Sequence, residues 1–480
     1  MNRRNFLKNA SLTATATAFA PNIIANTANP QDQQNPPKEI PEHEKNPLRL
    51  AFIGTGLMGG QNMRILLQNL KQHCVAVCDV DTKYGKINQL KYAPNAQVFI
   101  DYREMFEKLD GKIDGVVIST PDNSHFSIAM TALKYKVPAY VEKPLCYSIG
   151  QTRMLTEQAG KAGIATQMGN FVHSAAGIDY VREWVDAGAI GEVKEVLAWT
   201  CRPIIGCNQT PKGWDYWPKP DPIPPTLDWD KWLNITEYCD YYDAVVPLNW
   251  RRFFKFGSGS LGDIGCHIID VPITAFDLPA PTSVKVRQRG GTSICVPLQD
   301  QVEYYFPTSK FNKPIKVTWY SGVMKPDEFG NFPAGYDKSF LPPLPKEFTE
   351  TKRTYRHLSN DGMFIIGTEG VIYSPVMHLR GKPVLLPKKR EEQLKTILDE
   401  RTKKYKTTDH RLNFIEGIKG NVKKCNSDFS VAGPLTETVQ LGNVALQLNK
   451  DIVWDSKNMK CKGEPKADIY INPPMRKGWF

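Results

Sequence analysis

Three side chains have the types and spacing that proton transfer at a hydroxyl group requires. Asp263, near the end of the glycine-rich run 257–265, and His267 are four residues apart, and a helical pattern predicts that both lie on one face. An imidazole beside a carboxylate can take the proton of an alcohol. Lys143 can hold the negative charge that develops on the same oxygen. The residue types are therefore those that alcohol oxidation needs, but taken alone a single histidine on a helix more often has a structural role than a catalytic one.

A glycine-rich turn early in the chain predicts a dinucleotide site. The apolar run 48–53 has the length of a strand and is followed at once by Gly-Thr-Gly-Leu-Met-Gly (54–59) and a stretch of helical period. In such a turn the first glycine permits the tight bend, the second lets the backbone approach a pyrophosphate, and the third allows close helix packing. These roles fall to Gly54, Gly56 and Gly59. The N-terminus of the following helix would face the anionic diphosphate.

The end of the next apolar run favours one dinucleotide over the other. Residues 74–78 predict a second strand, and Asp79 follows it directly. A carboxylate at this place accepts hydrogen bonds from the adenosine ribose and repels a 2′-phosphate. The expected cofactor is therefore NAD rather than NADP. The alternative is a glycine-rich turn and an acidic loop residue that bind no ligand.

Two further apolar runs complete the pattern of a Rossmann domain, a doubly wound parallel sheet, over residues 48–170. Residues 113–118 and 139–141 predict buried parallel strands, whose carboxyl ends face the cofactor in this fold. Between them, residues 122–125 are expected to cap a helix that starts near Phe126. The residues that we expect to bind the cofactor are Gly54, Gly56, Leu57, Met58, Gly59, Asp79, Ser119, Thr120, Pro121, Asn123, His125, Glu142, Lys143, Asn170, Trp250 and Arg251.

The second half of the chain predicts an α+β domain over residues 171–480 that binds the substrate and supports oligomerisation. Segments of strand length replace the regular alternation of strands and helices, which is typical of a mostly antiparallel sheet. Tryptophan and proline crowd residues 199–256, and flat aromatic rings suit the CH faces of sugars, although core packing is the more common use of each ring. The expected strands include Val193–Trp199, Ser283–Arg289, Gln301–Phe306 and Ile315–Trp319.

The N-terminus predicts export. Arg3 and Arg4 precede Phe-Leu-Lys and a mildly apolar Ala/Thr stretch, which is typical of a twin-arginine signal peptide over residues 1–28. Residues 29–47, rich in Pro, Gln, Asn and Lys, have the composition of a flexible leader. We therefore expect export through the twin-arginine route to the periplasm, the alternative being a basic tail with a chance arginine pair. No later run is long enough to span a membrane.

Charge and cysteine content argue against several kinds of partner. The formal net charge is +11 at pH 7, yet no block of Lys and Arg with interleaved aromatic residues is present, so no nucleic-acid partner is expected. The ten cysteines show neither a Cys-x-x-Cys pair nor a metal-ligand spacing, so no metal site is expected. A disulfide between Cys201 and Cys207 stays open.

The motifs together resemble those of the Gfo/Idh/MocA family, which includes glucose–fructose oxidoreductase and inositol dehydrogenase. This resemblance, which covers essentially the whole chain after residue 47, implies a Rossmann domain, an open-faced antiparallel sheet domain, assembly as a homodimer or homotetramer, and a catalytic set of Lys143, Asp263 and His267. The aromatic stretch 200–255 is longer than in simple inositol dehydrogenases, which argues against a free monosaccharide as substrate. The matching motifs are Gly54–Gly59, Glu142-Lys143-Pro144, Trp250-Arg251, Asp263-x-Gly265-x-His267, Asn413–Ile418, Leu435–Glu437 and Leu441–Ala445.

Export and cofactor use constrain each other. A compartment without a free NAD pool requires that NAD be loaded in the cytoplasm, tightly bound, and reset within the site. Together with the resemblance, this predicts an enzyme that oxidises a secondary hydroxyl of a sugar or glycoside to a keto-sugar. A second keto-sugar or another acceptor would then reoxidise the cofactor.

Two alternatives stay open. NAD-dependent glycosidases such as the α-N-acetylgalactosaminidases share the superfamily: they oxidise C3 transiently, which acidifies the C2–H bond, eliminate the glycosidic bond, add water and reduce the ketone again. The third possibility is a non-catalytic sugar-binding protein on a relict Rossmann fold. In that case we would expect decay of the catalytic set, whereas Lys143, Asp263 and His267 are all present.

Overall fold

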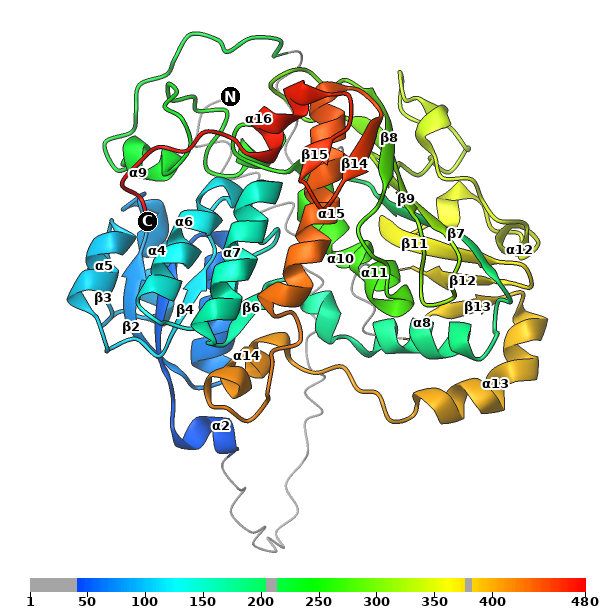
Figure 1. The fold of residues 1–480 in the computed structure, drawn as a ribbon, viewed down its shortest axis with the longest axis horizontal. Coiled ribbons are helices and arrows are strands. Elements are labelled where there is room, and N and C mark those ends of the chain that lie inside the picture. The colour runs from blue at the N-terminus through cyan, green and yellow to red at the C-terminus, as the bar shows by residue number, and fades with distance from the viewer. Residues whose placement is uncertain (1–40, 204–213, 376–381) are drawn as a thin grey trace, which may run out of the picture. The chain divides into compact units, whose positions relative to one another are not determined.

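The computed structural model describes residues 41–203, 214–375 and 382–480 (Figure 1). Their strands form one sheet of six strands and one of nine. The predicted signal peptide (1–28), most of the predicted leader (29–47) and Cys207 lie outside the described residues. Eight of the described cysteines have free thiols: Cys74, Cys78, Cys146, Cys239, Cys266, Cys295, Cys425 and Cys461.

The first sheet is entirely parallel and comes from the N-terminal part of the chain (Figure 1). Its strands are β1 (Arg49–Ile53), β2 (His73–Cys78), β3 (Gln97–Phe99), β4 (Gly115–Ile118), β5 (Ala139–Val141) and β6 (Thr166–Met168). Their order, β3-β2-β1-β4-β5-β6, is that of a doubly wound Rossmann sheet. The direction of winding reverses between β1 and β4, and such sheets bind ligands at the carboxyl ends beside this point.

Alternate residues of β1 enter the two hydrophobic layers on either side of this sheet. Leu50 and Phe52 pack in one cluster, whereas Ala51 and Ile53 pack in the other, as the two-residue period of a strand requires. The first cluster includes α14, so a late segment of the chain returns to the Rossmann sheet. The helices are α3 (Leu57–Met63), continued by a π-helical turn η1 (Arg64–Asn69), α4 (Tyr84–Tyr92), α5 (Tyr102–Lys108), α6 (Asp122–Lys134), α7 (Ile149–Ala162) and α14 (His410–Ile418).

One predicted helix start was wrong. Helix α6 begins at Asp122, four residues before the expected start at Phe126. Pro121 stands in extended conformation immediately before it, and an acidic residue is favourable in the first turn because it faces the positive end of the helix dipole. Residues 122–125 are therefore the first turn of the helix rather than a cap that precedes it.

The second sheet is mostly antiparallel, as predicted (Figure 1). Its strands follow the order β13-β12-β11-β7-β10-β9-β8-β14-β15, and β7 with β10 is its parallel pair. Strand β8 has the predicted bounds, while β7, β9 and β10 are one or two residues longer than predicted. The strands are β7 (Val193–Thr200), β8 (Ser283–Arg289), β9 (Gln299–Phe306), β10 (Ile315–Ser321), β11 (Asp361–Gly367), β12 (Val371–Ser374), β13 (Val384–Leu386), β14 (Ile452–Asp455) and β15 (Lys460–Cys461).

The two faces of this sheet have different neighbours. One face packs against helices, including the long α15, which also contacts α7 of the Rossmann domain. The other face is open over β8, where alternate residues are exposed, but residues 323–358 cover it over β7, β10 and β11 with a second hydrophobic cluster. The remaining helices are α2 (Glu42–Lys45), η2 (Phe171–Ser174), α8 (Ala176–Asp186), α9 (Trp229–Leu233), η3 (Asn249–Arg252), η4 (Leu261–Gly265), α10 (Cys266–Ile268), α11 (Asp270–Phe276), η5 (Lys338–Phe340), α12 (Lys346–Thr349), η6 (Tyr355–His357), α13 (Lys388–Thr402), α15 (Phe429–Leu448), η7 (Pro465–Ala467) and α16 (Asp468–Ile471).

The tryptophan-rich segment forms a hydrophobic core of its own. Trp229, Trp232 and Trp250 are all less than a tenth exposed, and Trp217 stacks on Tyr242 with ring centroids 4.9 Å apart. Backbone hydrogen bonds join this segment to the loop after β2. For these rings the structure therefore favours core packing over an exposed platform for sugars.

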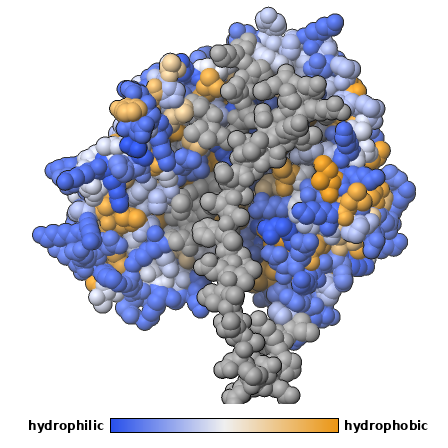
Figure 2. Space-filling view, turned by 180° about the vertical axis from the view of Figure 1, so that it is seen from behind, coloured by the Kyte–Doolittle hydropathy of each residue, from blue (hydrophilic) through white to orange (hydrophobic). Residues whose placement is uncertain are grey.

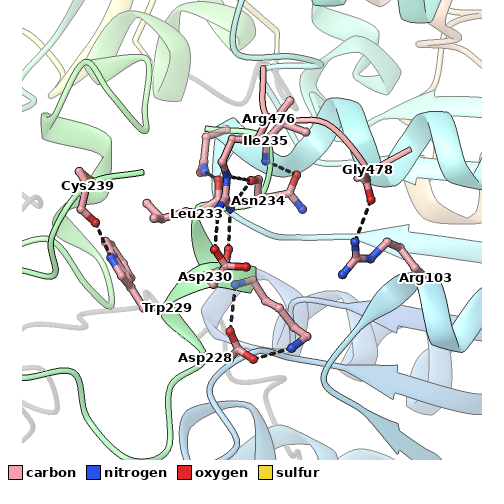
Figure 3. A network of polar contacts seen from close by, with 12 residues as sticks. Arg103, Asp228, Trp229, Asp230, Leu233, Asn234, Ile235, Cys239, Arg476 and Gly478 are labelled. Atoms are coloured by element: carbon pink, nitrogen blue, oxygen red, sulfur yellow. Dashed lines mark hydrogen bonds and ion pairs between the residues drawn. The ribbon is translucent and has the colours of Figure 1, made fainter. Parts of the chain in front are cut away.

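The C-terminal tail fastens this segment to the Rossmann domain (Figure 3). The Arg476 guanidinium donates to the carbonyl of Asn234 at 2.8 Å and pairs with Asp230. Two residues further, the carbonyl of Gly478 accepts a hydrogen bond from Arg103 of α5 at 2.8 Å. The tail thus bridges α9 and α5.

We expect Arg476→Met to lower the free energy of unfolding by roughly 1–3 kcal/mol, because it leaves the carbonyl of the buried Asn234 without its donor. Urea unfolding measures this loss, and limited proteolysis should become faster between residues 220 and 245. Lys477→Met, at the exposed neighbouring position, is the matched control. Equal stability of the two variants would contradict a fastening role for Arg476.

Strand β9 of the second sheet carries a buried carboxyl group. Asp300 of β9 is buried, and among the described residues its Oδ1 atom has no hydrogen-bond partner. Burial raises the pKa of Asp300 to about 7, although a hydrogen bond from Ser321 lowers it in part. The folded state therefore holds this proton more tightly than the unfolded chain does.

Because of this raised pKa, the protein should lose stability as the pH rises from the ordinary carboxyl range to about 7. Asp300→Asn removes the charge, so its advantage over the wild type should grow by roughly 2 kcal/mol between pH 5 and pH 8. Urea unfolding at both pH values measures this, with the exposed Asp110→Asn as control. If the difference in the free energy of unfolding between Asp300→Asn and the wild type is the same at both pH values, the pKa of Asp300 is not raised.

The described surface is mainly hydrophilic in the view of Figure 2, and its apolar residues lie in small separate groups. Within residues 41–203, 214–375 and 382–480, none of the helices combines the length and the apolar character needed to cross a membrane. The expected homodimer or homotetramer stays a prediction.

Candidate active site

The glycine-rich turn between β1 and α3 leaves no space for larger side chains. Gly54 has a φ of +77°, and a Cβ atom there would lie 2.7 Å from the carbonyl oxygen of Ser119. At Gly59 a Cβ atom would lie 1.9 Å from the carbonyl oxygen of Gly54. The turn therefore brings the ends of β1 and β4 into contact, at the place where the fold binds a dinucleotide.

Asp79 stands directly after β2, as predicted, and its carboxylate reaches the glycine-rich turn. The backbone N–H of Thr55 donates to Oδ2 at 2.9 Å, and that of Asp81 donates to Oδ1 at 3.0 Å. Burial raises the pKa of Asp79, and these hydrogen bonds oppose the rise. The carboxylate thus lies where a ribose would have to be recognised.

Among the described residues, four of the predicted cofactor residues carry a buried polar atom without a hydrogen-bond partner; one is Oδ1 of Asn123, and the other three follow neighbouring strands. Thr120, Glu142 and Asn170 follow β4, β5 and β6, which are neighbours in the sheet. The Oγ1 of Thr120, the Oε2 of Glu142 and the Oδ1 of Asn170 make no hydrogen bond within the part of the chain that the structure describes. Buried groups of this kind are rare, and a polar ligand at this edge would satisfy them.

Two other predicted cofactor residues are engaged with protein groups. Asn123 donates to the carbonyl of Leu233 at 3.2 Å, which holds α6 to the tryptophan-rich segment. Both ring nitrogens of His125 lie against backbone carbonyls, of Pro144 at 2.9 Å and of Thr120 at 3.0 Å. Both residues therefore brace the loops at this edge.

The remaining predicted cofactor residues lie in the turn after β1 and the loop after β4. Ser119 and Pro121 lie in the loop between β4 and α6, and the hydroxyl of Ser119 accepts a hydrogen bond from Asn62 at 3.1 Å. Leu57 and Met58 open α3, and Gly56 precedes them. A Cβ atom at Gly56 would lie 2.7 Å from the ring of Tyr84, so this ring covers the turn closely.

Asp263 is the centre of a cationic cluster. Its Oδ1 accepts a hydrogen bond from the Lys143 ammonium at 2.5 Å and lies 3.4 Å from Nε of Arg251, and Arg202 binds its Oδ2. The Lys143 and Asp263 side chains are only 11% and 7% exposed. Burial opposes the charge of Asp263, but Lys143, Arg202 and Arg251 outweigh it and hold the pKa of Asp263 well below its usual range.

Arg251 links this cluster to the predicted cofactor side. It lies in the short helix η3, with its guanidinium 4.1 Å from the centre of the Trp250 ring. Its charge lowers the pKa of Tyr84, which covers Gly56, against the larger effect of burial. Arg251 therefore interacts with Asp263 on one side and with Tyr84, which covers Gly56, on the other.

The expected pairing of Asp263 with His267 differs from the structure. Residues 261–265 form the π-helical turn η4, whose wider spacing changes the alignment of side chains four residues apart. The carboxylate of Asp263 turns to Lys143 and the arginines. His267 is buried, and its ring packs on Phe171 with centroids 4.9 Å apart.

His173, which was not among the predicted site residues, has a buried carboxylate partner. Its Nδ1 lies 2.9 Å from Oδ2 of Asp270. Asp270 is fully buried and also accepts hydrogen bonds from Asn170 at 3.0 Å and from Thr274 at 2.9 Å. The spacing of 263, 267 and 270, which repeats along one helical face, was a signal that could have identified Asp270.

The two acid–base clusters lie side by side at one edge of the Rossmann sheet. Val141 of β5 pairs with Met168 of β6, so Lys143 and Asn170, two positions further, occupy equivalent places. Asp263 contacts Lys143 and Asp270 contacts Asn170. The segment from η4 to α11 thus runs along the carboxyl ends of β5 and β6, with His267 between its two aspartates.

Comparison of the sequence with known proteins identifies a family to which both domains are similar. Residues 48–170 match the Gfo/Idh/MocA model described as an oxidoreductase family with an NAD-binding Rossmann fold, and residues 196–306 match the family's C-terminal α/β domain. Inositol 2-dehydrogenase from Burkholderia multivorans is 25% identical over 146 residues, which are 30% of this chain and 43% of that protein. The 2,7-anhydro-N-acetylneuraminate hydratase from Mediterraneibacter gnavus is 22% identical over 43% of this chain and 49% of that protein. The chain thus matches less than half the length of these relatives.

Solved structures share the fold over most of the chain. The WlbA dehydrogenase from Chromobacterium violaceum, in complex with NADH and UDP-GlcNAcA, is 13% identical with a TM-score of 0.56, covering 85% of this chain and 96% of that one. An inositol dehydrogenase homologue from Azotobacter vinelandii, in complex with NAD+, is 15% identical with a TM-score of 0.53, covering 85% and 97%. At these identities the likeness concerns the fold. The motif matches, the two domain matches and the common fold agree: the chain belongs to the Gfo/Idh/MocA oxidoreductase family, and its N-terminal domain is the family's NAD-binding Rossmann domain.

Proposed function

We propose that the chain is an exported, NAD-dependent oxidoreductase that converts a secondary hydroxyl of a sugar or glycoside to a ketone. The observation that carries this proposal is the Lys143–Asp263 ion pair at the carboxyl edge of the NAD-binding sheet. This ion pair lies near the buried Oε2 of Glu142 and Oδ1 of Asn170, which make no hydrogen bond within the described residues. A charged donor in a site closed to water is what a developing alkoxide requires.

The residues present fit NAD. The glycine-rich turn has no space for side chains, Asp79 lies where the ribose would be recognised, and Thr120, Glu142 and Asn170 offer unpaired polar atoms. We propose that these residues, together with Arg251, hold the dinucleotide. When bound, NAD accepts the hydride of the carbinol carbon.

Each residue of the catalytic set then has a separate task. We propose that Lys143 donates a hydrogen bond to the substrate oxygen and stabilises its negative charge, while His267 takes the hydroxyl proton. Asp263 holds the Lys143 ammonium in place through the 2.5 Å hydrogen bond and balances the charge of the two arginines. Asp263 is thus a positioning residue for Lys143 rather than for His267.

Purified full-length protein mixed with a panel of methyl glycosides tests this function. We expect the near-ultraviolet absorbance of reduced nicotinamide to appear without added cofactor, because export implies a tightly held NAD. Mass spectrometry of the supernatant after denaturation identifies the dinucleotide. A protein that releases no dinucleotide, and that reduces no added NAD with any glycoside, would sink the proposal.

A second candidate is a redox-neutral glycosidase that oxidises its substrate only transiently. The buried His173–Asp270 pair favours it, because elimination and hydration need proton transfer beyond that of alcohol oxidation. One relative is named a hydratase rather than a dehydrogenase. Release of p-nitrophenol from p-nitrophenyl glycosides, with no lasting absorbance of reduced cofactor, would support this candidate over net oxidation.

We also propose a periplasmic location, reached by the twin-arginine route, and a homodimer or homotetramer. Both rest on the sequence: the paired Arg3 and Arg4 support the route, and the family resemblance supports the assembly. Arg3→Lys with Arg4→Lys should leave the protein in the cytoplasm. Detection of the double variant in the periplasmic fraction would contradict this route.

A further inference from the structure

We propose that residues 226–236 form a strap that closes over the adenosine end of the bound dinucleotide and keeps NAD from exchanging with the solution. The strap consists of α9 and the three residues on either side of it. The inference rests on the proposed function, because that function requires NAD at the carboxyl edge of the Rossmann sheet. It adds the element of the chain that retains the cofactor there.

One end of the strap is joined to the residues that follow Asp79. The backbone N–H of Thr82 donates to the carbonyl of Thr226 at 2.9 Å. Two residues further, the N–H of Asp228 donates to the carbonyl of Val80 at 2.9 Å, and the two bonds form an antiparallel bridge. Because Asp79 lies where the adenosine ribose would be recognised, the strap begins at the adenosine end of the site.

The other end of the strap is joined to α6, which follows β4. The side-chain amide of Asn123 donates to the carbonyl of Leu233 at 3.2 Å and to Oγ1 of Thr236 at 3.1 Å. The hydroxyl of Ser127 donates to the side chain of Asn234. Strands β2 and β4 are the two neighbours of β1 in the sheet, so the strap extends from the end of one to the end of the other. The adenosine half of a bound dinucleotide would have to pass this segment to leave.

The inner side of the strap is apolar. The indole rings of its two tryptophans stack with centroids 4.7 Å apart, and the cluster to which they belong also contains Trp250, the neighbour of Arg251. Opening the strap would expose apolar side chains to water, which favours the closed form. Four strap side chains are less than a tenth exposed: Leu227, Trp229, Trp232 and Leu233.

The C-terminal tail holds the middle of the strap (Figure 3). The guanidinium of Arg476 donates to the backbone carbonyls of Asn234 and Asp230, each at 2.8 Å, and pairs with the Asp230 carboxylate. Beyond it, the ring of Phe480 packs edge-on against Phe126 of α6, with centroids 5.1 Å apart. A single arginine thus joins the strap to a tail that is itself anchored on the Rossmann domain.

The strap is fastened at separate points rather than along its whole length. A pocket of about 500 Å³ lies beside it, lined by strap residues and their neighbours at 225–230 and, from the Rossmann domain, by Val80, Thr82 and Ile100. A segment that is held at a few points can open locally while the domain stays folded. We therefore expect NAD to enter while the strap is open, and the frequency of opening to set the rate of its exchange.

The test measures exchange of the bound cofactor. Purified full-length protein that carries its own NAD is incubated with an excess of isotopically labelled NAD and separated from free nucleotide at intervals. Mass spectrometry of the dinucleotide released by denaturation gives the exchanged fraction. Arg476→Met should accelerate exchange on the order of 10-fold or more, because it removes the side-chain contacts of the tail with the strap. Lys477→Met, the matched control, should exchange as slowly as the wild type.

A reversible cross-link separates opening of the strap from unfolding of the domain. Thr82 and Thr226 lie opposite each other across the antiparallel bridge, at the kind of separation that a disulfide can span. Thr82→Cys and Thr226→Cys, added to Arg476→Met, should restore slow exchange when oxidised, and a reductant should make exchange fast again. Reduction of bound NAD by a glycoside in a single turnover should be equal in all these proteins, because the changes lie at the adenosine end.

The outcomes separate the strap from the proposed function. Equal exchange rates in the wild type and Arg476→Met, or fast exchange in the oxidised cross-linked protein, overturn the strap. A protein that is purified without a dinucleotide, yet oxidises a glycoside with added NAD, also overturns it and leaves the oxidation intact. If the strap variants behave as expected but no glycoside reduces the bound NAD, the strap stands and the proposed function fails.

Discussion

Lys143→Met should slow the reduction of bound NAD by substrate on the order of 10³-fold, which is the effect of removing one preorganised donor to a developing oxyanion. Methionine keeps the apolar stem of the side chain and removes only the ammonium. Asp263 keeps Arg202 and Arg251 as partners, so its charge stays compensated and the fold should persist. A single-turnover measurement with excess glycoside isolates this step.

The control for this variant is Lys86→Met, which removes an exposed lysine of the same domain. Both proteins should release the same amount of NAD after denaturation, because the glycine-rich turn, Asp79 and Arg251, which we propose to hold the dinucleotide, are unchanged. Reduction within tenfold of the wild-type rate in Lys143→Met would mean that another group stabilises the oxygen. In that case the ion pair with Asp263 would be structural.

His267→Gln should lower the same rate on the order of 10²- to 10⁴-fold, the usual contribution of a positioned base. Glutamine keeps a polar group of similar size at this buried place, beside the ring of Phe171, and cannot take a proton. Because the transfer removes a proton from the hydroxyl, the residual activity of the variant should increase with added imidazole. The measurement is again a single turnover, followed by quantification of bound NAD.

His357→Gln, at an exposed position, is the matched control for this second substitution. Turnover by His267→Gln at the wild-type rate would remove His267 from the role of base. His173 would then be the next candidate, since it is the histidine that carries a buried carboxylate on its Nδ1. Comparison of His267→Gln with His173→Gln therefore shows which of the two histidines takes the hydroxyl proton.

The sequence was most informative where the structure depends on local geometry. The glycines at 54, 56 and 59 are required because carbonyl groups and the Tyr84 ring approach them closely, and this requirement can be recognised from spacing alone. Apolar runs identified the parallel strands and the longer antiparallel ones for the same reason, since each run reflects burial on known faces. The fold class, the family and the cofactor NAD could therefore be predicted from the sequence.

The partners of the proposed catalytic residues could not be predicted from the sequence. Asp263 contacts Lys143 after β5, Arg202 after β7 and Arg251 in η3, and these segments are far apart in the chain. A π-helical turn at 261–265 changed the expected alignment of Asp263 with His267. A π-helical turn depends on the packing around it, so no local sequence pattern predicts it.

His173 is a second residue whose partner could not be predicted from the sequence. Its neighbours in sequence are ordinary, and its chemistry comes from Asp270, which the sequence placed near His267 but not beside β6. The contribution of α14 to the Rossmann core, through Phe414 and Ile415, is likewise a contact that only tertiary structure reveals. Long-range contacts, rather than element types, were the missing information.

The central claim is that this chain oxidises a sugar hydroxyl with NAD that it carries itself. The most direct measurement is the near-ultraviolet absorbance of the protein as purified, recorded after addition of methyl glycosides and without added cofactor. We expect one of them to produce the absorbance of reduced nicotinamide, in an amount equal to the NAD that denaturation releases. Released NAD that no glycoside can reduce, even transiently on a stopped-flow time scale, would contradict it.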